Sequence, residues 1–418
     1  MKIKPSRIFY GWWVVAACFI ISLYVTGIIG FGVTALFEPL SNKFGWSYAQ
    51  ISFASSLRGL EVGLMAPVVG FMVDRWGPRK LIIGGTILCG LGVLLLSQVT
   101  TLGMFYAAFA LVALGMSTLS PTVTMTATAN WFHRKIGLAT GLMHSGVGFS
   151  GLMLPLLTLL IDASGIERAM LILGAVLIAV IVPISLLIRD NPEKYGLLPD
   201  GVAADKADKN NSVLINGTGQ ELSIKEALRD RAFWYLSVAV LIQILIVNAM
   251  TTHMMPFLGS IGIDRANASL IASAVPLSSV GGRLGFGWLS DRISPRRIMA
   301  AGYAMMVIGI VFFVLAVVLN PLFLFPAVPV FSIGFGGNAT VRATLVRDYY
   351  GRKSFGTIHG LVMGLAVVGN IVGPPLAGWT YDNYSSYQNI WVAFGFVSLI
   401  PVAMMLLMRK PGKVTVYQ

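Results

Sequence analysis

The chain has 418 residues, of which 56% are hydrophobic and only 11% are charged, and its formal net charge is +13. This composition argues against an ordinary soluble domain, because apolar segments long enough to cross a bilayer recur along the whole chain. We therefore expect an all-α, polytopic membrane protein that lies in a lipid bilayer.

The predicted spans follow from the apolar runs in chain order. Two of these runs, 81–132 and 298–341, are about twice the roughly 20 residues that one crossing needs. Each has a break, at Thr100–Gly103 in the first and at Asn320-Pro321 in the second. The full set of charge-free runs is 8–37, 81–132, 136–161, 169–188, 232–263, 298–341, 354–381 and 383–408. With the arginine-containing segments 47–73 and 266–290 added, twelve transmembrane helices are predicted.

The basic charge is distributed unevenly between the two predicted faces of the membrane. Only Lys43, Arg168 and Arg265 fall in the odd-numbered connections, and Arg58, Arg283 and Arg342 fall within spans. The other Lys and Arg residues lie in the terminal segments and the even-numbered connections, which is the positive-inside pattern. The sequence thus predicts a multi-pass protein of the cell membrane with both termini in the cytoplasm. The charge orients the protein, and no nucleic-acid partner is expected.

The chain repeats itself. Residues 70–80 read GFMVDRWGPRK and residues 287–297 read GWLSDRISPRR, the same pattern after spans 2 and 8. Parallel repeats of six spans predict two similar helical bundles. Between them the composition turns polar, so the predicted organisation is an N-terminal bundle at 1–189, a cytoplasmic linker at 190–230 and a C-terminal bundle at 231–418. Ser223-Ile224-Lys225-Glu226 has the form of a capping box and predicts a short helix before span 7.

No catalytic or metal-binding constellation is visible. Gly146–Gly151 satisfies the Gly-x-Gly-x-x-Gly fingerprint, but it lies inside an apolar helix and lacks the strand that a dinucleotide site requires. Close helix packing is the better interpretation. Cys18 and Cys89 fall inside spans and are expected to be packing residues. We expect no enzyme, no cofactor and no metal.

The two repeated loops resemble the signature loop of the major facilitator superfamily. This resemblance covers the whole chain and implies the fold of that superfamily, with alternating access between two bundles. On physical grounds, Asp74 with Arg75 and Asp291 with Arg292 are predicted to form a conformational latch, and Arg342, near the end of span 10, is a predicted partner of Asp291. The alternative is that the loops only maintain topology through their positive charge.

A narrower resemblance follows from residues 130–151, NWFHRKIGLATGLMHSGVGFSG, which are similar to the span 4–5 motif of monocarboxylate porters. Related oxalate/formate exchangers share much of this motif. The resemblance implies a span 8 arginine that binds the substrate carboxylate, at Arg283. It also implies an aspartate four residues earlier for proton coupling, but this sequence has Ser279 there, which puts that proton relay in doubt.

Arg283 also stands out without the resemblance. It lies eight residues before Asp291, so about 12 Å along the helix and near the middle of the hydrocarbon core. A lone guanidinium there costs at least about 2.5 kcal/mol on insertion scales, and a carboxylate that accepts two parallel bonds would stabilise it. Permanent pairing with a structural carboxylate such as Glu61 is the alternative.

Other titratable groups are candidates for proton coupling. Glu61 shares a helix face with Arg58, which favours either an ion pair or a protonatable site. His253, near Pro256 at the outer part of span 7, is expected to be protonated from the outer side and to contact substrate. His144 in span 5 ranks behind both. Each histidine could instead be a hydrogen-bonded packing residue.

The sequence therefore predicts a secondary transporter that carries a small organic monocarboxylate, of the lactate or pyruvate type, together with a proton, by alternating access. The alternatives are an organic-anion exchanger of the oxalate/formate type, a carrier of a larger anionic or aromatic solute, and a non-transporting membrane sensor. The predicted substrate site is Arg283 with Ser279 and His253. The expected partners are a small organic anion and protons, and the expected functional unit is a monomer.

Overall fold

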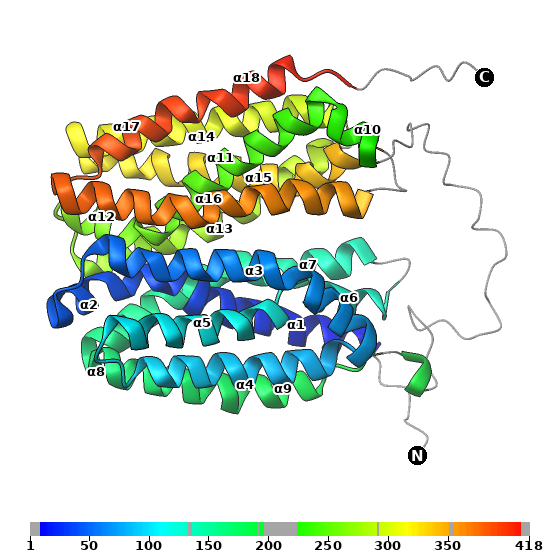
Figure 1. Cartoon of the computed structure of the whole chain (residues 1–418), viewed down its shortest axis with the longest axis horizontal. Coiled ribbons are helices and arrows are strands. Elements are labelled where there is room, and N and C mark those ends of the chain that lie inside the picture. The colour runs from blue at the N-terminus through cyan, green and yellow to red at the C-terminus, as the bar shows by residue number, and fades with distance from the viewer. Residues whose placement is uncertain are drawn as a thin grey trace. The chain divides into compact units, whose positions relative to one another are not determined.

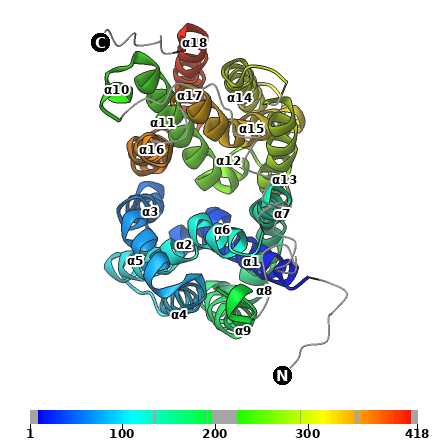
Figure 2. The ribbon, with the colours of Figure 1, turned by 90° about the vertical axis from the view of Figure 1, so that its right-hand side faces the viewer.

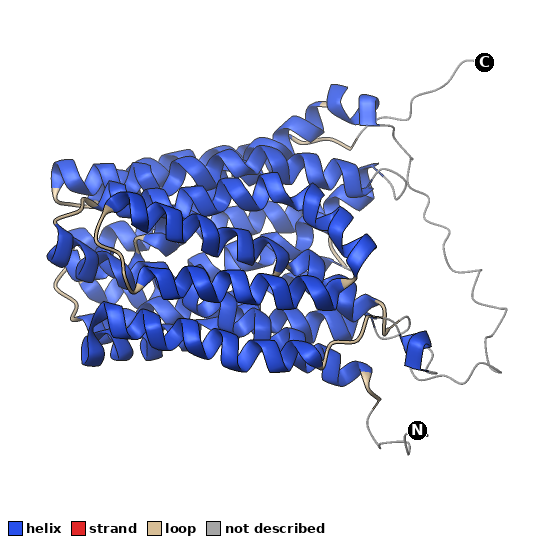
Figure 3. Ribbon diagram, turned by 60° about the horizontal axis from the view of Figure 1, so that its bottom comes forward, coloured by secondary structure: helices blue, strands red, loops and turns tan. Residues whose placement is uncertain are grey.

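A computed structural model describes residues 9–132, 136–190, 192–195, 224–290, 292–350 and 355–410. A few side chains inside these ranges are not described, among them those of Arg58, Glu61 and Asp74. The described part of the chain is helical and contains no strand (Figure 3). The all-helical fold class predicted from the apolar runs is confirmed.

The chain divides into two compact units. The first contains residues 1–46 and 57–214, and the second contains residues 47–56 and 215–418. In the first half of the chain the helices, labelled in Figure 1, are α1 (Gly11–Val25), α2 (Phe37–Phe44), α3 (Tyr48–Trp76), α4 (Pro78–Leu96), α5 (Leu102–Thr118), α6 (Pro121–Ala129), α7 (Ile136–Phe149), α8 (Met153–Val176) and α9 (Val182–Leu186). Short 3₁₀ and π turns join some of these: η1 (Thr26–Phe31), η2 (Gly32–Leu36), η3 (Ser150–Leu152), η4 (Leu177–Ile181) and η5 (Pro192–Tyr195).

The helices of the second half begin after the linker. They are α10 (Ile224–Arg229), α11 (Arg231–Thr252), α12 (Met254–Ser260), α13 (Arg265–Ser290), α14 (Pro295–Val318), α15 (Leu324–Tyr350), α16 (Phe355–Tyr384), α17 (Gln388–Val397) and α18 (Leu399–Leu407), with the 3₁₀ turn η8 (Pro321–Phe323) before α15. Within this unit α13, α14 and α15 lie side by side (Figure 2). The short helix predicted by the capping box at Ser223 is confirmed as α10.

Both breaks predicted in the long apolar runs are present. The first run is interrupted between Leu96 and Leu102, where Thr101 caps α5 by accepting a hydrogen bond from the backbone N–H of Met104. The second is interrupted after Val318, where the Asn320 side chain accepts from the N–H of Leu322. Polar capping residues inside an apolar sequence therefore mark the turns between spans.

Nine helical stretches of the described chain are long and apolar enough to cross a membrane. One of them, Leu138–Leu186, is 49 residues long and contains a break at Gly165, where φ is 78°. The helices α3 and α13 are 29 and 26 residues long, but they are not among those nine stretches. Two crossings in Leu138–Leu186 together with α3 and α13 would give the twelve spans, a number that stays a prediction.

Glycines allow close helix contacts in each unit. In the first unit, a Cβ atom on Gly146 of α7 would lie 2.5 Å from the carbonyl oxygen of Phe19 in α1. The interpretation of Gly146–Gly151 as a packing motif is thus confirmed at Gly146. In the second unit, a Cβ atom on Gly282 of α13 would lie 2.1 Å from the carbonyl oxygen of Ile333 in α15. These contacts fix the register of α13 against α15, which matters for the position of Arg283.

Candidate functional site

Arg283 lies in α13, directly after Gly282 at the close contact with α15. Its side chain is half-buried, and no hydrogen bond or ion pair joins it to any side chain that the structure describes. The carboxylates of Glu61 and Asp291 lie outside the described residues. Within the described part of the chain, Arg283 is therefore a cation without a counterion, in a helix long enough to span a bilayer.

Ser279 lies one turn before Arg283 and is completely buried. Its hydroxyl donates to the carbonyl oxygen of Pro276, 2.6 Å away in the same helix, and its backbone packs against Gly336 of α15. The small side chain therefore suits the tight contact of α13 with α15. Its predicted contact with substrate stays a prediction.

Arg342 lies deeper in the second unit and is only 7% exposed. Its Nη2 atom donates to the side-chain oxygen of Gln243 in α11 over 3.3 Å, and its Nη1 atom lies 2.8 Å from the sulfur of Met363 in α16. The hydroxyl of Tyr303 in α14 donates to the same Gln243 oxygen over 3.4 Å. Side chains of α11 and α16 thus contact this guanidinium of α15, and α14 joins the group through Gln243. The predicted latch between Arg342 and Asp291 stays a prediction, because Asp291 is not among the described residues.

His253 occupies the break between α11 and α12 and is completely buried. Its Nε2 atom lies 2.9 Å from the carbonyl oxygen of Pro374, and its Nδ1 atom lies 2.9 Å from the hydroxyl of Tyr387. Because a carbonyl only accepts, we assign the hydrogen to Nε2, and Nδ1 then accepts from Tyr387. The imidazole is closed in by α16 and by the residue before α17, and its protonation from the outer side stays a prediction. Its roles in binding and coupling stay predictions.

The remaining predicted site residues belong to different segments of the chain. Arg75 is exposed in the last turn of α3, and the guanidinium of Arg292 lies 3.9 Å from the ring centroid of Trp288. His144 is half-buried in α7. The side chains of Glu61 and Asp74 and the whole of Asp291 lie outside the described residues. The structure therefore leaves the proposed latches and proton pathway as predictions.

Asp190 is a functional candidate that the sequence interpretation missed. Its Oδ1 atom accepts from the backbone N–H of Arg79, 3.0 Å away, at the start of α4. The preceding Gly77 has φ of 80°, and a Cβ atom there would lie 2.8 Å from the carboxyl carbon of Asp190. The first signature loop is therefore held by a carboxylate from the beginning of the linker. A possible signal was that Asp190 is the first acidic residue after the last apolar run of this half.

The sequence interpretation also missed Gln243 and Tyr303. A polar amide inside the apolar segment 232–263 was the available signal for Gln243. Tyr303 carried no signal, because a tyrosine in a transmembrane helix is common and only the fold brings its hydroxyl to Gln243.

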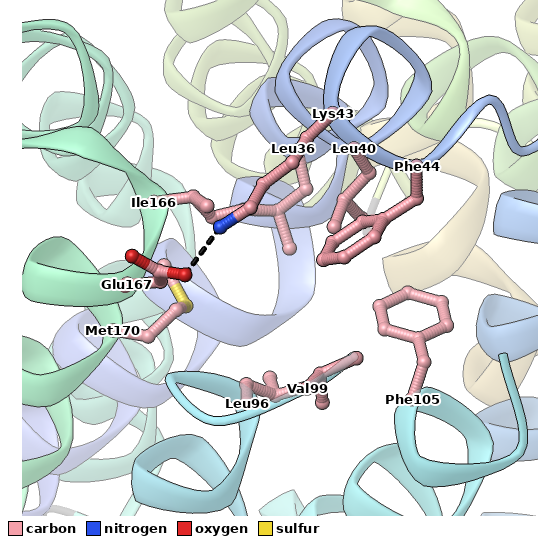
Figure 4. Close-up of a pocket in the computed structure, with 10 residues that line it drawn as sticks. All are labelled: Leu36, Leu40, Lys43, Phe44, Leu96, Val99, Phe105, Ile166, Glu167 and Met170. Atoms are coloured by element: carbon pink, nitrogen blue, oxygen red, sulfur yellow. Dashed lines mark hydrogen bonds and ion pairs between the residues drawn. The ribbon is translucent and has the colours of Figure 1, made fainter. Parts of the chain in front are cut away.

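One pocket of the first unit is apolar and contains none of the predicted site residues. In Figure 4 the ammonium group of Lys43 forms an ion pair with Glu167 at its edge. The pocket is lined by Leu36, Leu40, Lys43, Phe44, Leu96, Val99, Phe105, Ile166, Glu167 and Met170. Because this ion pair is largely exposed, it contributes at most about 1 kcal/mol. We assign the pocket no role in recognising an anion.

Comparison with known proteins gives a consistent family. The family profile described as Major Facilitator Superfamily matches residues 12–341 and again 254–416. The chain is 26% identical over 412 residues to monocarboxylate transporter 12 of Mus musculus, covering 93% of this chain and 83% of that one. It is 24% identical over 406 residues to human monocarboxylate transporter 2, with the same coverage.

A solved structure shares the fold. The crystal structure of a bacterial homolog to the human lysosomal transporter Spinster, in an inward-facing and occupied conformation, matches with a TM-score of 0.75 at 16% identity. The match covers 97% of each chain.

Proposed function

Because the chain belongs to the Major Facilitator Superfamily and is a transporter rather than an enzyme, we propose that it carries a small organic monocarboxylate across the cell membrane. We also propose that the anion is carried together with a proton, and that the two units expose the substrate site to each side of the membrane in turn. The relatives named as monocarboxylate transporters support a small organic anion as the substrate class. We further propose that both termini face the cytoplasm, in keeping with the positive-inside pattern, and that a monomer is the functional unit.

The observation that carries this proposal is the half-buried Arg283, without a counterion among the described side chains. A guanidinium offers a planar pair of N–H donors that matches the two oxygens of a carboxylate. In a site of low dielectric these bonds are stronger than in water. Arg283 would therefore bind the substrate carboxylate, with Ser279 and His253 as further contacts when the site opens.

Glu61 is our first candidate for proton coupling, followed by His253 and His144. His253 would take part only if its hydrogen bond with Tyr387 breaks, because both ring nitrogens are engaged. The latch would be formed by the two signature loops, with Asp74 and Arg75 in one and Asp291 and Arg292 in the other. Asp74→Asn should then slow exchange while changing substrate affinity by no more than a few-fold.

One observation favours a second candidate, an organic-anion exchanger. Ser279 stands where the resemblance to monocarboxylate porters implies an aspartate for proton coupling, and its hydroxyl is bound to Pro276. An exchanger balances charge by moving one anion against another and needs no proton relay. An exchanger therefore does not require a carboxylate at position 279.

Flux through purified protein in liposomes tests the proposal and separates the two candidates. A proton-coupled carrier takes up labelled lactate or pyruvate into empty liposomes, and an inward proton gradient accelerates the uptake. An exchanger requires an anion inside the liposome. Absence of lactate and pyruvate flux under both conditions would show that these monocarboxylates are not the substrate.

A further inference from the structure

Two hydrogen-bond donors in the second unit share a single neutral acceptor, and a third donor beside them has none. The side-chain oxygen of Gln243 accepts from Arg342 Nη2 over 3.3 Å and from the hydroxyl of Tyr303 over 3.4 Å. Both distances are at or beyond the long end of the normal range for these bonds. The Nε–H of Arg342 is buried and has no acceptor in the described structure. One of the three donors is therefore left unsatisfied.

The positive charge of Arg342 also has no counterion among the described side chains. The residue is 7% exposed, and none of the described acidic side chains forms an ion pair with it. Its Nη1 atom faces the sulfur of Met363, which is a weak acceptor on a flexible side chain. A buried cation with only neutral partners is destabilising, so this position favours an anion.

The geometry selects the kind of anion. Nε–H and Nη2–H lie on the same edge of a guanidinium, and this edge binds the two oxygens of a carboxylate side-on. One of these donors is unsatisfied, and the other is held only by the Gln243 oxygen, which the Tyr303 hydroxyl also contacts. A carboxylate in place of the Gln243 oxygen would accept from both edge donors and from Tyr303.

Gln243 can yield this position by rotating its side-chain amide. Its Nε2 atom donates to the carbonyl oxygen of Phe335 over 3.2 Å. Rotation of the amide about its terminal bond would move the oxygen away from Arg342 and break the bond to Phe335, and the NH₂ group could then donate to the incoming anion. The amide therefore acts as a neutral substitute for the ligand when the site is empty.

We propose that Arg342, Tyr303 and Gln243 form a second carboxylate-binding site, distinct from Arg283. The inference rests on the proposed function, because the carboxylate is that of the transported anion. Gly336 of α15 packs against Ser279 of α13. Arg342 follows Gly336 by six residues, about 9 Å along its helix, and Arg283 follows Ser279 by four residues, about 6 Å along its helix. The two arginines thus lie on different helices and differ by only about 3 Å in their position along the paired helices α13 and α15. The Arg342 site is set apart from Arg283 by its partners Gln243 on α11 and Tyr303 on α14.

The test measures the thermal stability of the purified full-length protein as sodium pyruvate is added, with sodium chloride at equal ionic strength as the reference. A ligand that binds only the folded state raises the unfolding temperature. All variants are made in an Arg283→Gln background, which silences the first site. We expect that Arg283→Gln alone keeps a pyruvate-dependent rise, that adding Arg342→Met abolishes it, and that adding Tyr303→Phe reduces it.

Two matched variants control for charge and geometry. Arg347→Met removes an exposed arginine from the same helix and should leave the rise intact. Arg342→Lys keeps the charge but loses the side-on pair of donors, so we expect the pyruvate concentration at half-maximal effect to increase about tenfold or more. This variant also covers the case in which Arg342→Met does not fold.

Three results would overturn the proposal. The first is a pyruvate response that survives both Arg342→Met and Arg342→Lys. The second is an equal response to chloride, which would indicate an inorganic anion site. The third is a lowered unfolding temperature of Arg342→Met in the absence of ligand, if adding Asp291→Asn restores it. That result would indicate that Arg342 belongs to the latch instead. Liposome flux of the wild-type protein tests the proposed function separately, so the two failures are distinguishable.

Discussion

The imidazole of His253 and the hydroxyl of Tyr387 form a hydrogen bond of 2.9 Å that connects the break between α11 and α12 to the residue just before α17. Tyr387 also stacks on Tyr381 and on Trp391, with ring centroids 4.7 Å and 5.5 Å apart. A neutral imidazole satisfies both of its partners in this arrangement. Protonation would require Tyr387 to give up its role as donor, which ties the charge of His253 to the packing of this end of the unit.

Tyr387→Phe should lower the stability of the protein by about 1–3 kcal/mol, because it leaves the buried Nδ1 atom of His253 without a donor. The aromatic stack is preserved in this variant, so the loss reports the hydrogen bond. Thermal or denaturant unfolding of the detergent-purified protein measures it. Tyr384→Phe, on an exposed ring, is the control and should be neutral. Equal stability of the two variants would contradict the structural role of this bond.

Asp190→Ala should destabilise the start of α4 by about 1 kcal/mol, the usual cost of losing a helix cap. The backbone N–H of Arg79 would lose its acceptor. Asp190→Asn retains a side-chain oxygen and should recover most of the loss. Hydrogen exchange at residues 79–82 in the two variants measures the effect locally. Unchanged protection of these amides in Asp190→Ala would show that the carboxylate does not hold the loop.

Asp264 gives a prediction for pH. Hydrogen bonds from the backbone and side chain of Asn267 hold the pKa of this exposed carboxyl below its usual value. A lowered pKa in the folded state stabilises the protein above the pKa of the unfolded chain, and this contribution is lost as pH falls through the folded pKa. The unfolding temperature of Asp264→Ala should thus lie below that of the wild type at pH 7, and the two should converge in acid. A constant difference across this range would contradict the assignment.

How far the sequence predicts the structure depends on whether a feature is local. The turn at Thr101 and the helix α10 follow from capping residues that are adjacent in the chain, and both were predicted. The prolines Pro374 and Pro375 inside α16 also act locally, because a proline frees a backbone carbonyl one turn earlier in the helix. Proline at 375 frees the carbonyl of Ile371, and the hydroxyl of Ser56 donates to it over 2.7 Å.

Features that depend on tertiary contact were not predicted. The π turn Thr26–Phe31 in the first span has no signature in an apolar sequence. The convergence of Gln243, Tyr303 and Arg342 requires three helices from distant parts of the chain. The sequence could identify Arg342 as an unusual charge, but its amide and hydroxyl partners emerge only from the packing of α11, α14 and α15.

Glu61→Gln should remove the stimulation of uptake by an inward proton gradient if Glu61 carries the coupled proton. Glu167→Gln, on an exposed glutamate of the first unit, is the matched control and should retain the stimulation. The double variant Glu61→Gln, His253→Gln tests the second candidate. Undiminished stimulation in the double variant would exclude both residues and would favour exchange, or co-entry of the neutral acid.

The central claim is that Arg283 binds the substrate carboxylate, and the most direct measurement is lactate or pyruvate binding to Arg283→Lys and Arg283→Ala, with thermal stability recorded on the same samples. We predict a large loss of affinity in Arg283→Lys, because lysine keeps the charge but lacks the paired donors. Arg283→Ala should fold and should show no saturable binding at the position that Arg283 occupies in the wild type. A structural ion pair would behave oppositely, since alanine would leave a buried carboxylate unpaired and cost about 3–5 kcal/mol. Destabilised Arg283→Ala with wild-type binding in its folded fraction would contradict the account.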